Sequence, residues 1–364
     1  MGPVGGAKFD VAWRRITLAA VTIYDVAARS GVSIKSVSRV LNGEPNVSPA
    51  LREKVSRAVE ALGYRRSLSA RSLAGATSSL IAALADAALT IEHWRSGRGN
   101  DYLSRLELGA LMECRKADYH LMVELVDHGA ETLDRELMAL LAAIRPGGVL
   151  LTPPNSDHGT VLDVLDQEGV NYARIGARTQ LDRGFCVSMD ERQASFDMTA
   201  YLISLGHRRI GFITGPPAYP ASQLRQAGYQ DALAAHGLAL DEAAIVEGDF
   251  TFPSGMRGMT ALLNSVPGLT GVFASNDDMA LGALQAAAAA GLSVPQDLSL
   301  VGFDDTPSAL FSTPTLTTIR QPVAEMAAEA MRGLIGLLKP DSVRPDGPMT
   351  VPYELIRRQS ARAI

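Results

Sequence analysis

Hydrophobic and polar positions follow a helical period near the start of the chain. Ile23, Val26 and Ala27 fall at positions i, i+3 and i+4 and form one apolar stripe. Gly31 predicts the end of this helix, because glycine tolerates the left-handed conformation that ends helices. Ser33 is of a residue type that caps the start of a second helix. The pattern therefore predicts two short helices joined by a tight turn.

The second expected helix has two different faces. At about 100° per residue, Val37, Val40 and Leu41 cluster on one side, where they pack on the first helix. The opposite arc carries the side chains that are free to contact something else, namely Ile34, Lys35, Ser38, Arg39 and Asn42. Arg and Lys contact guanine edges, Asn contacts adenine, and an apolar side chain meets a thymine methyl group. The alternative is an ordinary helical hairpin with a solvated polar face.

A third helix and a short basic stretch come next. Ser48 and Pro49 form an N-cap followed by proline at the first helical position, and Gly63 ends the helix. Residues 64–75 are basic and too few to form a stable helix in isolation. This stretch is expected to become ordered only when something supports it.

From residue 79 onward, short apolar runs alternate with helical patterns. The apolar runs include residues 80–84, 121–126, 148–152, 210–214, 272–275 and 298–303. The helical patterns include residues 103–117, 133–144, 194–205, 228–236, 279–290 and 323–338. This alternation predicts parallel sheets covered by helices on both faces. About nine strands are too many for one compact sheet of this type, so two α/β lobes are expected.

Residues suited to ligand binding follow several of these runs. Ligands of parallel sheets lie beyond the carboxyl ends of the strands. Asp86, Phe250, Asn276 and Asp304 stand at such ends, and Arg225 lies near the start of a helix. The alternative for Asn276 and Asp304 is a helix cap or a strand-end turn, where these residue types are common.

Charge is distributed unevenly along the chain. Residues 1–75 hold 12 Lys and Arg against 5 Asp and Glu, whereas residues 76–364 hold 22 against 34. A basic head on an acidic body is what nucleic-acid binding by one end requires. The two cysteines, Cys114 and Cys186, have no metal-ligand spacing and indicate buried thiols in a reducing cytosol. No export signal and no membrane-spanning stretch is found, so a cytoplasmic protein is expected.

The chain resembles the lactose-repressor (LacI/GalR) family of bacterial transcription factors, from about residue 21 to about residue 358. The resemblance rests on residues in the family's order and spacing, namely 21–27, 31–33, 37–42, 52–55, 63–64 and 71–74. It implies DNA contacts through Thr22, Tyr24, Ser33, Ile34, Lys35, Ser38, Arg39, Asn42, Asn46 and Ser48. It also implies that Leu73, with Ala70 and Ala74 beside it, enters the minor groove and kinks the DNA. The implied effector contacts are Asp86, Arg225, Phe250, Asn276 and Asp304. An Arg–Asp–Asn set with a flat ring suits a polyhydroxylated ligand.

The resemblance also implies the domain organisation. An all-α helix-turn-helix head precedes an α/β sensor with two lobes and parallel sheets, like the periplasmic binding proteins. The expected segments are a disordered extension (1–20), the helix-turn-helix domain (21–66), a hinge helix and linker (67–77), the effector-binding and dimerisation domain (78–358) and a C-terminal tail (359–364). The lobes are expected to be joined by crossovers near residues 187–190 and 308–323.

One segment departs from the family. After the first strand the family usually has a short loop, whereas here residues 87–101 are longer by several residues and carry Trp94. The segment borders the cleft. It is interpreted as a flexible surface loop, and the alternative is that it reshapes the effector pocket.

The predicted function is a ligand-responsive regulator of transcription, most simply a repressor of carbohydrate uptake or catabolism genes. It would bind a pseudo-palindromic DNA operator as a homodimer and take a sugar or glycoside as effector, without membrane association. No phosphate-binding loop, nucleophile elbow or zinc spacing is present, so neither an enzyme nor a cofactor is expected. The alternatives are a sugar-binding receptor or a sugar-acting enzyme on the same two-lobed fold, and an activator in place of a repressor.

Overall fold

The computed structural model describes residues 21–41, 44–64, 78–96, 101–339 and 347–364. The chain divides into two compact units, Met1–Ala76 and Thr77–Ile364, and each is described by itself. The expected extension (1–20) and hinge (67–77) lie outside the described residues.

The described part of the first unit is helical. Its helices are α1 (Ile23–Ser30), α2 (Ile34–Leu41) and α3 (Pro49–Leu62). They enclose a small apolar cluster in which Val26, Val37 and Val55 are fully buried. The expected pair of helices joined by a tight turn is confirmed.

Polar side chains fix where each of these helices begins. The carboxylate of Asp25 accepts hydrogen bonds from N and Oγ1 of Thr22, both at 2.7 Å, at the start of α1. The Oγ atoms of Ser33 and Ser48 accept hydrogen bonds from backbone amides three residues later, at 3.1 and 3.3 Å. Gly31 has a φ of 61° and ends α1, as its position in the sequence predicts.

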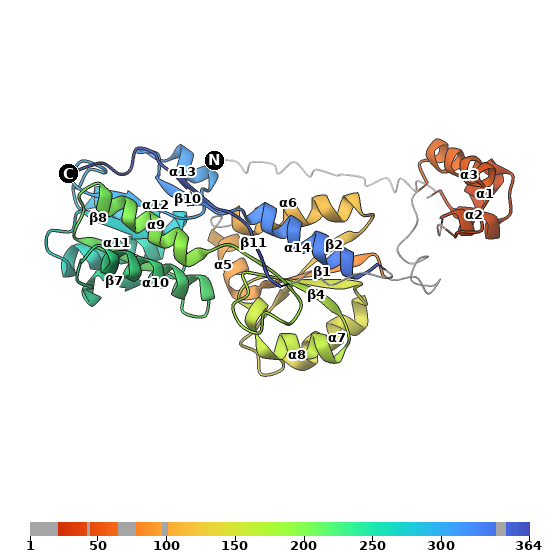
Figure 1. Ribbon diagram of the computed structural model, residues 1–364, viewed down its shortest axis with the longest axis horizontal. Coiled ribbons are helices and arrows are strands. Elements are labelled where there is room, and N and C mark those ends of the chain that lie inside the picture. Colours follow the sequence, from red (N-terminus) through yellow and green to blue (C-terminus); the bar gives the residue numbers. More distant parts are fainter. Residues whose placement is uncertain (1–20, 42–43, 65–77, 97–100, 340–346) are drawn as a thin grey trace, which may run out of the picture. The chain divides into compact units, whose positions relative to one another are not determined.

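The first lobe of the second unit is built on a six-stranded parallel sheet (Figure 1). Its order is β11 (Met349–Thr350), β5 (Phe185–Ser188), β4 (Asn171–Ile175), β3 (Gly148–Leu151), β1 (Leu80–Asp86) and β2 (His120–Val126). Successive side chains of β1 point to opposite faces. Ile81 and Ala83 join the apolar cluster on one face of the sheet, whereas Ala82 and Leu84 join the cluster on the other face.

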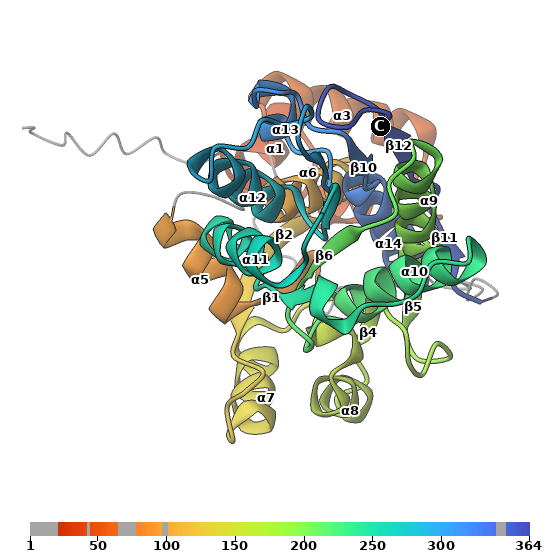
Figure 2. The ribbon, with the colours of Figure 1, turned by 90° about the vertical axis from the view of Figure 1, so that its left-hand side faces the viewer.

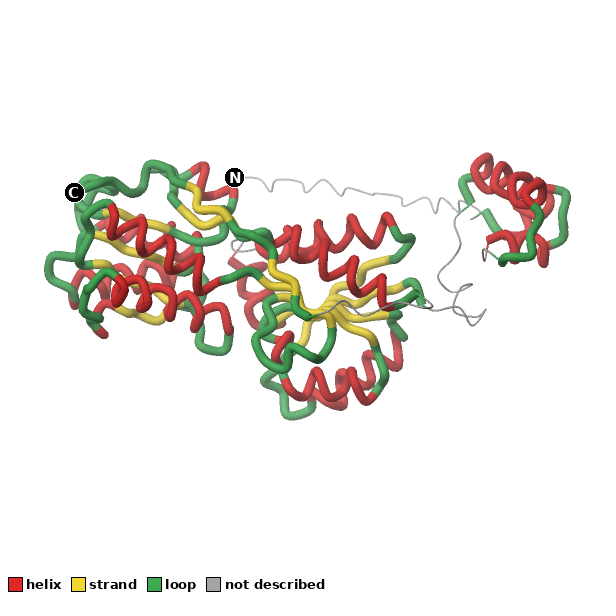
Figure 3. Tube along the Cα trace, viewed as in Figure 1, coloured by secondary structure: helices red, strands yellow, loops and turns green. Residues whose placement is uncertain are grey.

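The helices of this lobe cover both faces of the sheet. Their bounds are α5 (Ala87–Ser96), α6 (Asp101–Lys116), α7 (Leu133–Ile144), η1 (Asn155–Asp157), α8 (Gly159–Gln167) and α14 (Val323–Leu337). Figure 3 shows the strands of the lobe enclosed between helical layers.

The second lobe has a four-stranded parallel sheet between two helical layers (Figure 2). The strand order is β7 (Ile245–Glu247), β6 (Ile210–Thr214), β8 (Gly271–Ala274) and β9 (Ser299–Val301). Its helices are α9 (Glu191–Ser204), α10 (Pro220–Ala235), η2 (Glu242–Ala244), α11 (Phe252–Ser265), α12 (Asp277–Ala289) and α13 (Pro307–Phe311). Helices α9 and α10 cover one face, and α11 and α12 cover the other.

The chain passes between the lobes three times within the described residues. One passage joins β5 to α9, and a second joins β10 (Thr318–Arg320) to α14. The third joins β11 to β12 (Glu354–Ile356), which pairs antiparallel with β10. This third passage was not expected from the sequence, because β11 and β12 are too short to show a periodic pattern.

The end of the chain belongs structurally to the second lobe. Ser360 is 1% exposed, and its hydroxyl donates to Leu300 O. His207 bridges Thr270 Oγ1 and Arg362 O through its two ring nitrogens, both at 3.1 Å. Burial lowers the pKa of His207. The neutral ring therefore ties the chain end to the lobe through hydrogen bonds.

The segment 87–101 is not the flexible loop that the sequence indicated. Residues Ala87–Ser96 form α5, and α6 begins at Asp101. The prediction failed because the segment has a weak apolar stripe, while its helix is supported by contacts outside itself. Leu89 packs against the apolar cluster of the second lobe.

None of the described helices combines the length and the apolar composition that a membrane crossing requires. Cys114 and Cys186 are both buried, as expected, and they form no disulfide with one another.

Helix α6 packs closely on α14 at Gly109, where an added Cβ would overlap the backbone carbonyl of Ala324. We expect Gly109→Ala to lower the free energy of unfolding by about 1–3 kcal/mol, because one helix must move away from the other. The matched control is Gly336→Ala in α14, where nothing lies within 4 Å of the added Cβ. It should be neutral or slightly stabilising. Urea unfolding followed by circular dichroism measures both, and equal effects would contradict the packing argument.

Candidate functional site

A cavity of about 340 Å³ lies in the second unit, at the carboxyl ends of strands from both sheets. Such ends are where parallel α/β sheets bind ligands. All five predicted effector contacts are among the residues that line the cavity, namely Asp86, Arg225, Phe250, Asn276 and Asp304. The cavity therefore brings together side chains that are widely separated in the sequence.

Arg225 is the central cation of the cavity and is only 4% exposed. It lies in α10, and its Nε donates to Glu191 Oε2 at 2.8 Å. Its Nη1 donates to Ser275 O, and its guanidinium carbon lies 3.7 Å from the ring centroid of Phe303. These contacts come from α9 and from the segments that follow β8 and β9, and they fix the guanidinium in the lining of the cavity.

Asp304 supplies a carboxyl group near Arg225. Its backbone has a φ of 122°, a conformation that non-glycine residues rarely adopt, and Arg105 of α6 donates to its carbonyl at 2.8 Å. The Gln321 amide donates to its carboxylate. Burial raises the pKa of Asp304 to about 7, although the nearby Arg225 lowers it. The carboxyl group can therefore exchange protons near neutral pH.

Asn276 acts as a helix cap, which was the alternative considered from the sequence. Its Oδ1 accepts from Met279 N at 2.9 Å, at the start of α12. Its Nδ2 donates to Phe250 O, also at 2.9 Å. The residue still lines the cavity, so its cap role also fixes the amide beside any ligand.

Phe250 presents an aromatic wall. Its φ of 64° turns the chain after β7, and its ring meets Tyr219 edge-on at 5.5 Å between centroids. The ring also lies against Gly215, where a Cβ would overlap it. Glycine at this position, directly after β6, is what admits the ring to the cavity.

Asp86 ends β1 and begins α5. Its Oδ1 accepts from Leu89 N at 2.8 Å, and its Oδ2 lies 3.3 Å from His128 Nδ1. Burial and the Asp86 carboxylate raise the pKa of Tyr219, which comes from the other lobe. Asp86 therefore has a structural role at the helix start and also faces the second lobe.

Sequence reasoning missed the residues that hold the predicted ones in place. Glu191 and Gln321 lie where the chain crosses between lobes, and they bind Arg225 and Asp304 respectively. Tyr219 and α5 were missed too. A usable signal was the position of both residues at or next to the expected crossovers near 187–190 and 308–323, because chain crossing between lobes passes beside the cleft.

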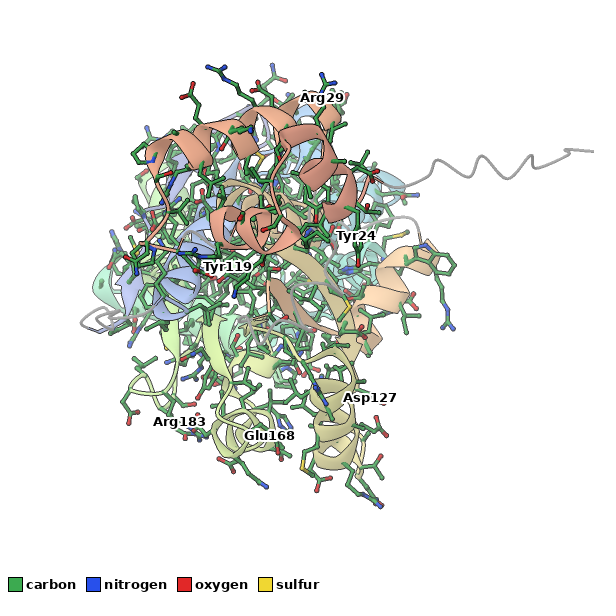
Figure 4. All side chains as sticks on the ribbon, turned by 90° about the vertical axis from the view of Figure 1, so that its right-hand side faces the viewer. Tyr24, Arg29, Tyr119, Asp127, Glu168 and Arg183 are labelled. Atoms are coloured by element: carbon green, nitrogen blue, oxygen red, sulfur yellow. The ribbon has the colours of Figure 1, made fainter. Side chains whose placement is uncertain are left out.

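The described polar residues of the first unit lie largely at its surface. Those expected to contact DNA and found exposed are Thr22, Tyr24, Ser33, Ile34, Lys35, Asn46 and Ser48. Tyr24 is 68% and Ile34 40% exposed, although both are large and apolar. Figure 4 shows the side chain of Tyr24 projecting from α1. Exposed aromatic and aliphatic side chains beside lysine are typical of a surface that binds a partner.

Arg39 is placed differently from a freely exposed side chain. Its Nε donates to Glu44 at 2.9 Å and its Nη2 to Asn46 O at 2.8 Å. Arg39 and Ser38 are both half-buried. Arg39 thus stabilises the connection between α2 and α3 in this structure. Four further predicted DNA contacts, Asn42, Ala70, Leu73 and Ala74, lie outside the described residues.

Comparisons with known proteins cover both units. The family described as bacterial regulatory proteins, lacI family, matches residues 22–67, and a periplasmic binding protein-like domain matches residues 199–361. The HTH-type transcriptional regulator AscG of Escherichia coli (strain K12) is 34% identical over 93% of this chain and 98% of its own length. Catabolite control protein A of Priestia megaterium is 32% identical over 94% of this chain and 99% of its own.

Solved structures of transcriptional regulators are also similar to this chain. A transcriptional regulator CelR–cellobiose complex matches with a TM-score of 0.70 and 31% identity, over 93% of this chain and 99% of that one. The lac repressor dimer bound to operator and the anti-inducer ONPF matches with a TM-score of 0.76 and 28% identity. That match covers 94% of this chain and 100% of the other. The two-lobed parallel fold behind a helix-turn-helix unit is confirmed.

The raised pKa of Asp304 predicts a pH-dependent cost of folding. The folded protein binds a proton that an unfolded aspartate, with a pKa of 3.8, releases, so stability falls as the pH rises from about 4 to about 7. Asp304→Asn should raise the melting temperature more at pH 8 than at pH 5. The control is Asp305→Asn, which loses the 2.7 Å ion pair with Arg320. This variant should have a lower melting temperature at both pH values. A change in melting temperature on Asp304→Asn that is the same at pH 5 and pH 8 would contradict this interpretation.

Proposed function

The chain belongs to the lacI family of bacterial regulatory proteins, and we propose that it is a ligand-responsive repressor that binds operator DNA. The observation that carries the proposal is the polar face of α2. Ile34 and Lys35 are exposed on this short helix, while Val37 is buried against the rest of the first unit. A helix of this kind fits the major groove, where such side chains reach base edges.

The DNA contacts proposed for the first unit fall into two groups. Ile34, Lys35, Ser38, Arg39 and Asn42 would contact base edges. Those that would contact phosphates or neighbouring edges are Thr22, Tyr24, Ser33, Asn46 and Ser48. Helix starts suit phosphates because their free amides point outward, which supports the proposed role of the capping hydroxyl groups. We also propose that Leu73, with Ala70 and Ala74, enters the minor groove from the hinge 67–77.

The cavity of the second unit is proposed to bind a sugar or glycoside. The relative CelR was solved with cellobiose, and its likeness to this chain motivates the proposal. Arg225 and Asp304 offer a donor and an acceptor for hydroxyl groups, and Phe250 offers a ring face. A cavity of about 340 Å³ is within the range that small ligands occupy.

Homodimerisation is supported by an exposed apolar face on α6. Leu108, Leu111 and Met112 are 58%, 47% and 49% exposed, and they recur at helical spacing. The lac repressor, which this chain resembles, was solved as a dimer on its operator. We propose that a second copy covers this face and that two first units then bind two halves of a pseudo-palindromic site in the cytoplasm.

The receptor and enzyme alternatives are weaker. A receptor has no use for a DNA-binding unit, and the curated relatives quoted above are regulators by name. An activator differs from a repressor only in where the operator lies relative to the promoter. A reporter gene placed under the selected operator distinguishes them, since a repressor lowers its expression.

Lys35→Ala should weaken operator binding about 5-fold to 150-fold and weaken binding to random duplex much less, because Lys35 contacts bases. Fluorescence anisotropy measures both, with the operator obtained by selection from random duplexes. The matched control is Arg57→Ala on α3, whose side chain is 77% exposed and paired with Glu53. This variant also removes one positive charge, but it should change the affinity for operator and for random duplex by the same factor. A Lys35→Ala variant with unchanged preference would contradict the assigned face.

Arg225→Ala should abolish the release of operator by sugar and leave operator binding intact, because it removes the buried cation of the cavity and changes no residue of the first unit. The same anisotropy assay is titrated with a panel of sugars and glycosides. The control is Arg192→Ala, an exposed arginine on α9 paired with Asp231 at 2.5 Å. It should respond like the unaltered protein. Full release from the Arg225 variant would show that the effector binds elsewhere.

A further inference from the structure

Arg105 connects the two lobes from outside the cavity. It lies in the second turn of α6 in the first lobe, and the described residues that line the cavity do not include it. Its Nη1 donates to Asp304 O at 2.8 Å, and its Nη2 donates to Asp305 O. Both acceptors belong to the turn that follows β9 in the second lobe. The fork of one guanidinium therefore holds two successive carbonyl groups of the opposite lobe.

Helix α6 gives Arg105 a rigid base in the first lobe. The next residue, Leu106, is fully buried, and Gly109 packs directly on the backbone of α14. Helices α6 and α14 lie side by side in Figure 1. Because α6 is fixed to its own lobe, Arg105 cannot follow the second lobe when the lobes move apart. Such a movement breaks its hydrogen bonds and also displaces Tyr102, which lines the cavity from the first turn of α6.

The other end of this contact is an unusual turn. Asp304 and Asp305 have φ values of 122° and 53°, and two successive non-glycine residues in this region are unfavourable unless their surroundings hold them. The Asp305 carboxylate accepts from Arg320 Nε at 2.7 Å and from Arg358, while Arg105 binds the carbonyl side of the turn. The backbone of the turn decides where the Asp304 carboxyl group points. Arg105 therefore helps to place a cavity residue although it does not line the cavity.

Arg105 also lies beside the surface proposed for the dimer. At about 100° per residue it falls on the same side of α6 as Leu108 and Met112, which are 58% and 49% exposed. Arg105 itself is half-buried, because its guanidinium binds the second lobe. A second copy that covers this face would exclude water from these hydrogen bonds and strengthen them.

We propose that Arg105 is a positioning residue of the effector site. Its contact with the Asp304–Asp305 turn sets the fraction of the protein whose lobes are arranged to bind the effector. The apparent dissociation constant equals the intrinsic constant divided by that fraction, so loss of the contact weakens binding although no contact with the ligand is lost. The inference rests on the proposed effector site and adds a residue that acts on this site from outside.

The first test needs no ligand and follows hydrogen exchange of the full chain by mass spectrometry. Helix α5 is the reporter, because Asp86 of the first lobe caps it while Leu89 packs on the apolar cluster of the second lobe. Arg105→Ala should make the amides of α5 exchange at least about threefold faster, since lobes that separate more often release Leu89. Arg105→Lys should restore part of the protection. The control is Arg115→Ala, which changes an exposed arginine of the same helix and should leave the exchange of α5 unaltered.

The second test is calorimetric titration of the same variants with cellobiose, lactose and methyl glucoside. Arg105→Ala should weaken each sugar that binds by at least about fivefold and by the same factor, because it changes the population of the binding arrangement. A residue that contacts the ligand would instead discriminate between the sugars. Sedimentation should show the same oligomeric state for the variant and the unaltered protein.

Any of four results would overturn the role of Arg105. They are an exchange of α5 that Arg105→Ala leaves unchanged, unchanged affinity for a sugar that binds, losses of affinity that differ between sugars, and a changed oligomeric state, which would make Arg105 a residue of the dimer interface. Faster exchange of α5 without binding of any sugar would instead overturn the proposed sugar effector and support the contact between the lobes.

Discussion

The buried charge of Arg225 is the constraint on which the second unit depends. A guanidinium that is 4% exposed is costly to bury unless anionic and carbonyl groups surround it. Glu191, at the first passage between lobes, binds it directly, and Asp304, which contributes to its electrostatic environment, is held by Gln321 at the second passage. The cavity and the connections between the lobes are therefore built from the same interactions. A ligand that engages this cluster must also act on the lobe connections.

Helix α6 offers a physical route from the cavity to the rest of the protein. It begins at the cavity with Tyr102, and Arg105 binds the carbonyls of Asp304 and Asp305 in the opposite lobe. Its outer face is the exposed apolar surface proposed for the dimer. A ligand shifts the equilibrium between two arrangements of the lobes only if it binds one arrangement more tightly than the other. The contacts of Arg105 are one place where the two arrangements would differ.

Much of this architecture could be predicted from the sequence, since the helical pattern of 133–144 matches α7 and the continuous apolar run 210–214 matches β6. Short elements could not: β10, β11 and β12 have two or three residues and depend on pairing. Helix α5 was mistaken for a loop because contacts with the other lobe support it. The five cavity residues were found from strand ends and family resemblance. Glu191 and Gln321 were missed because their role appears only when the lobes are joined.

The most direct test of the account is to measure effector affinity for the free protein and for the protein saturated with operator DNA. Binding free energies are coupled reciprocally, so an effector that weakens operator binding by a given factor must itself bind more weakly to the operator complex by that factor. The account predicts a difference between the two affinities that equals the effect of effector on operator binding. Identical affinities with and without operator would contradict it.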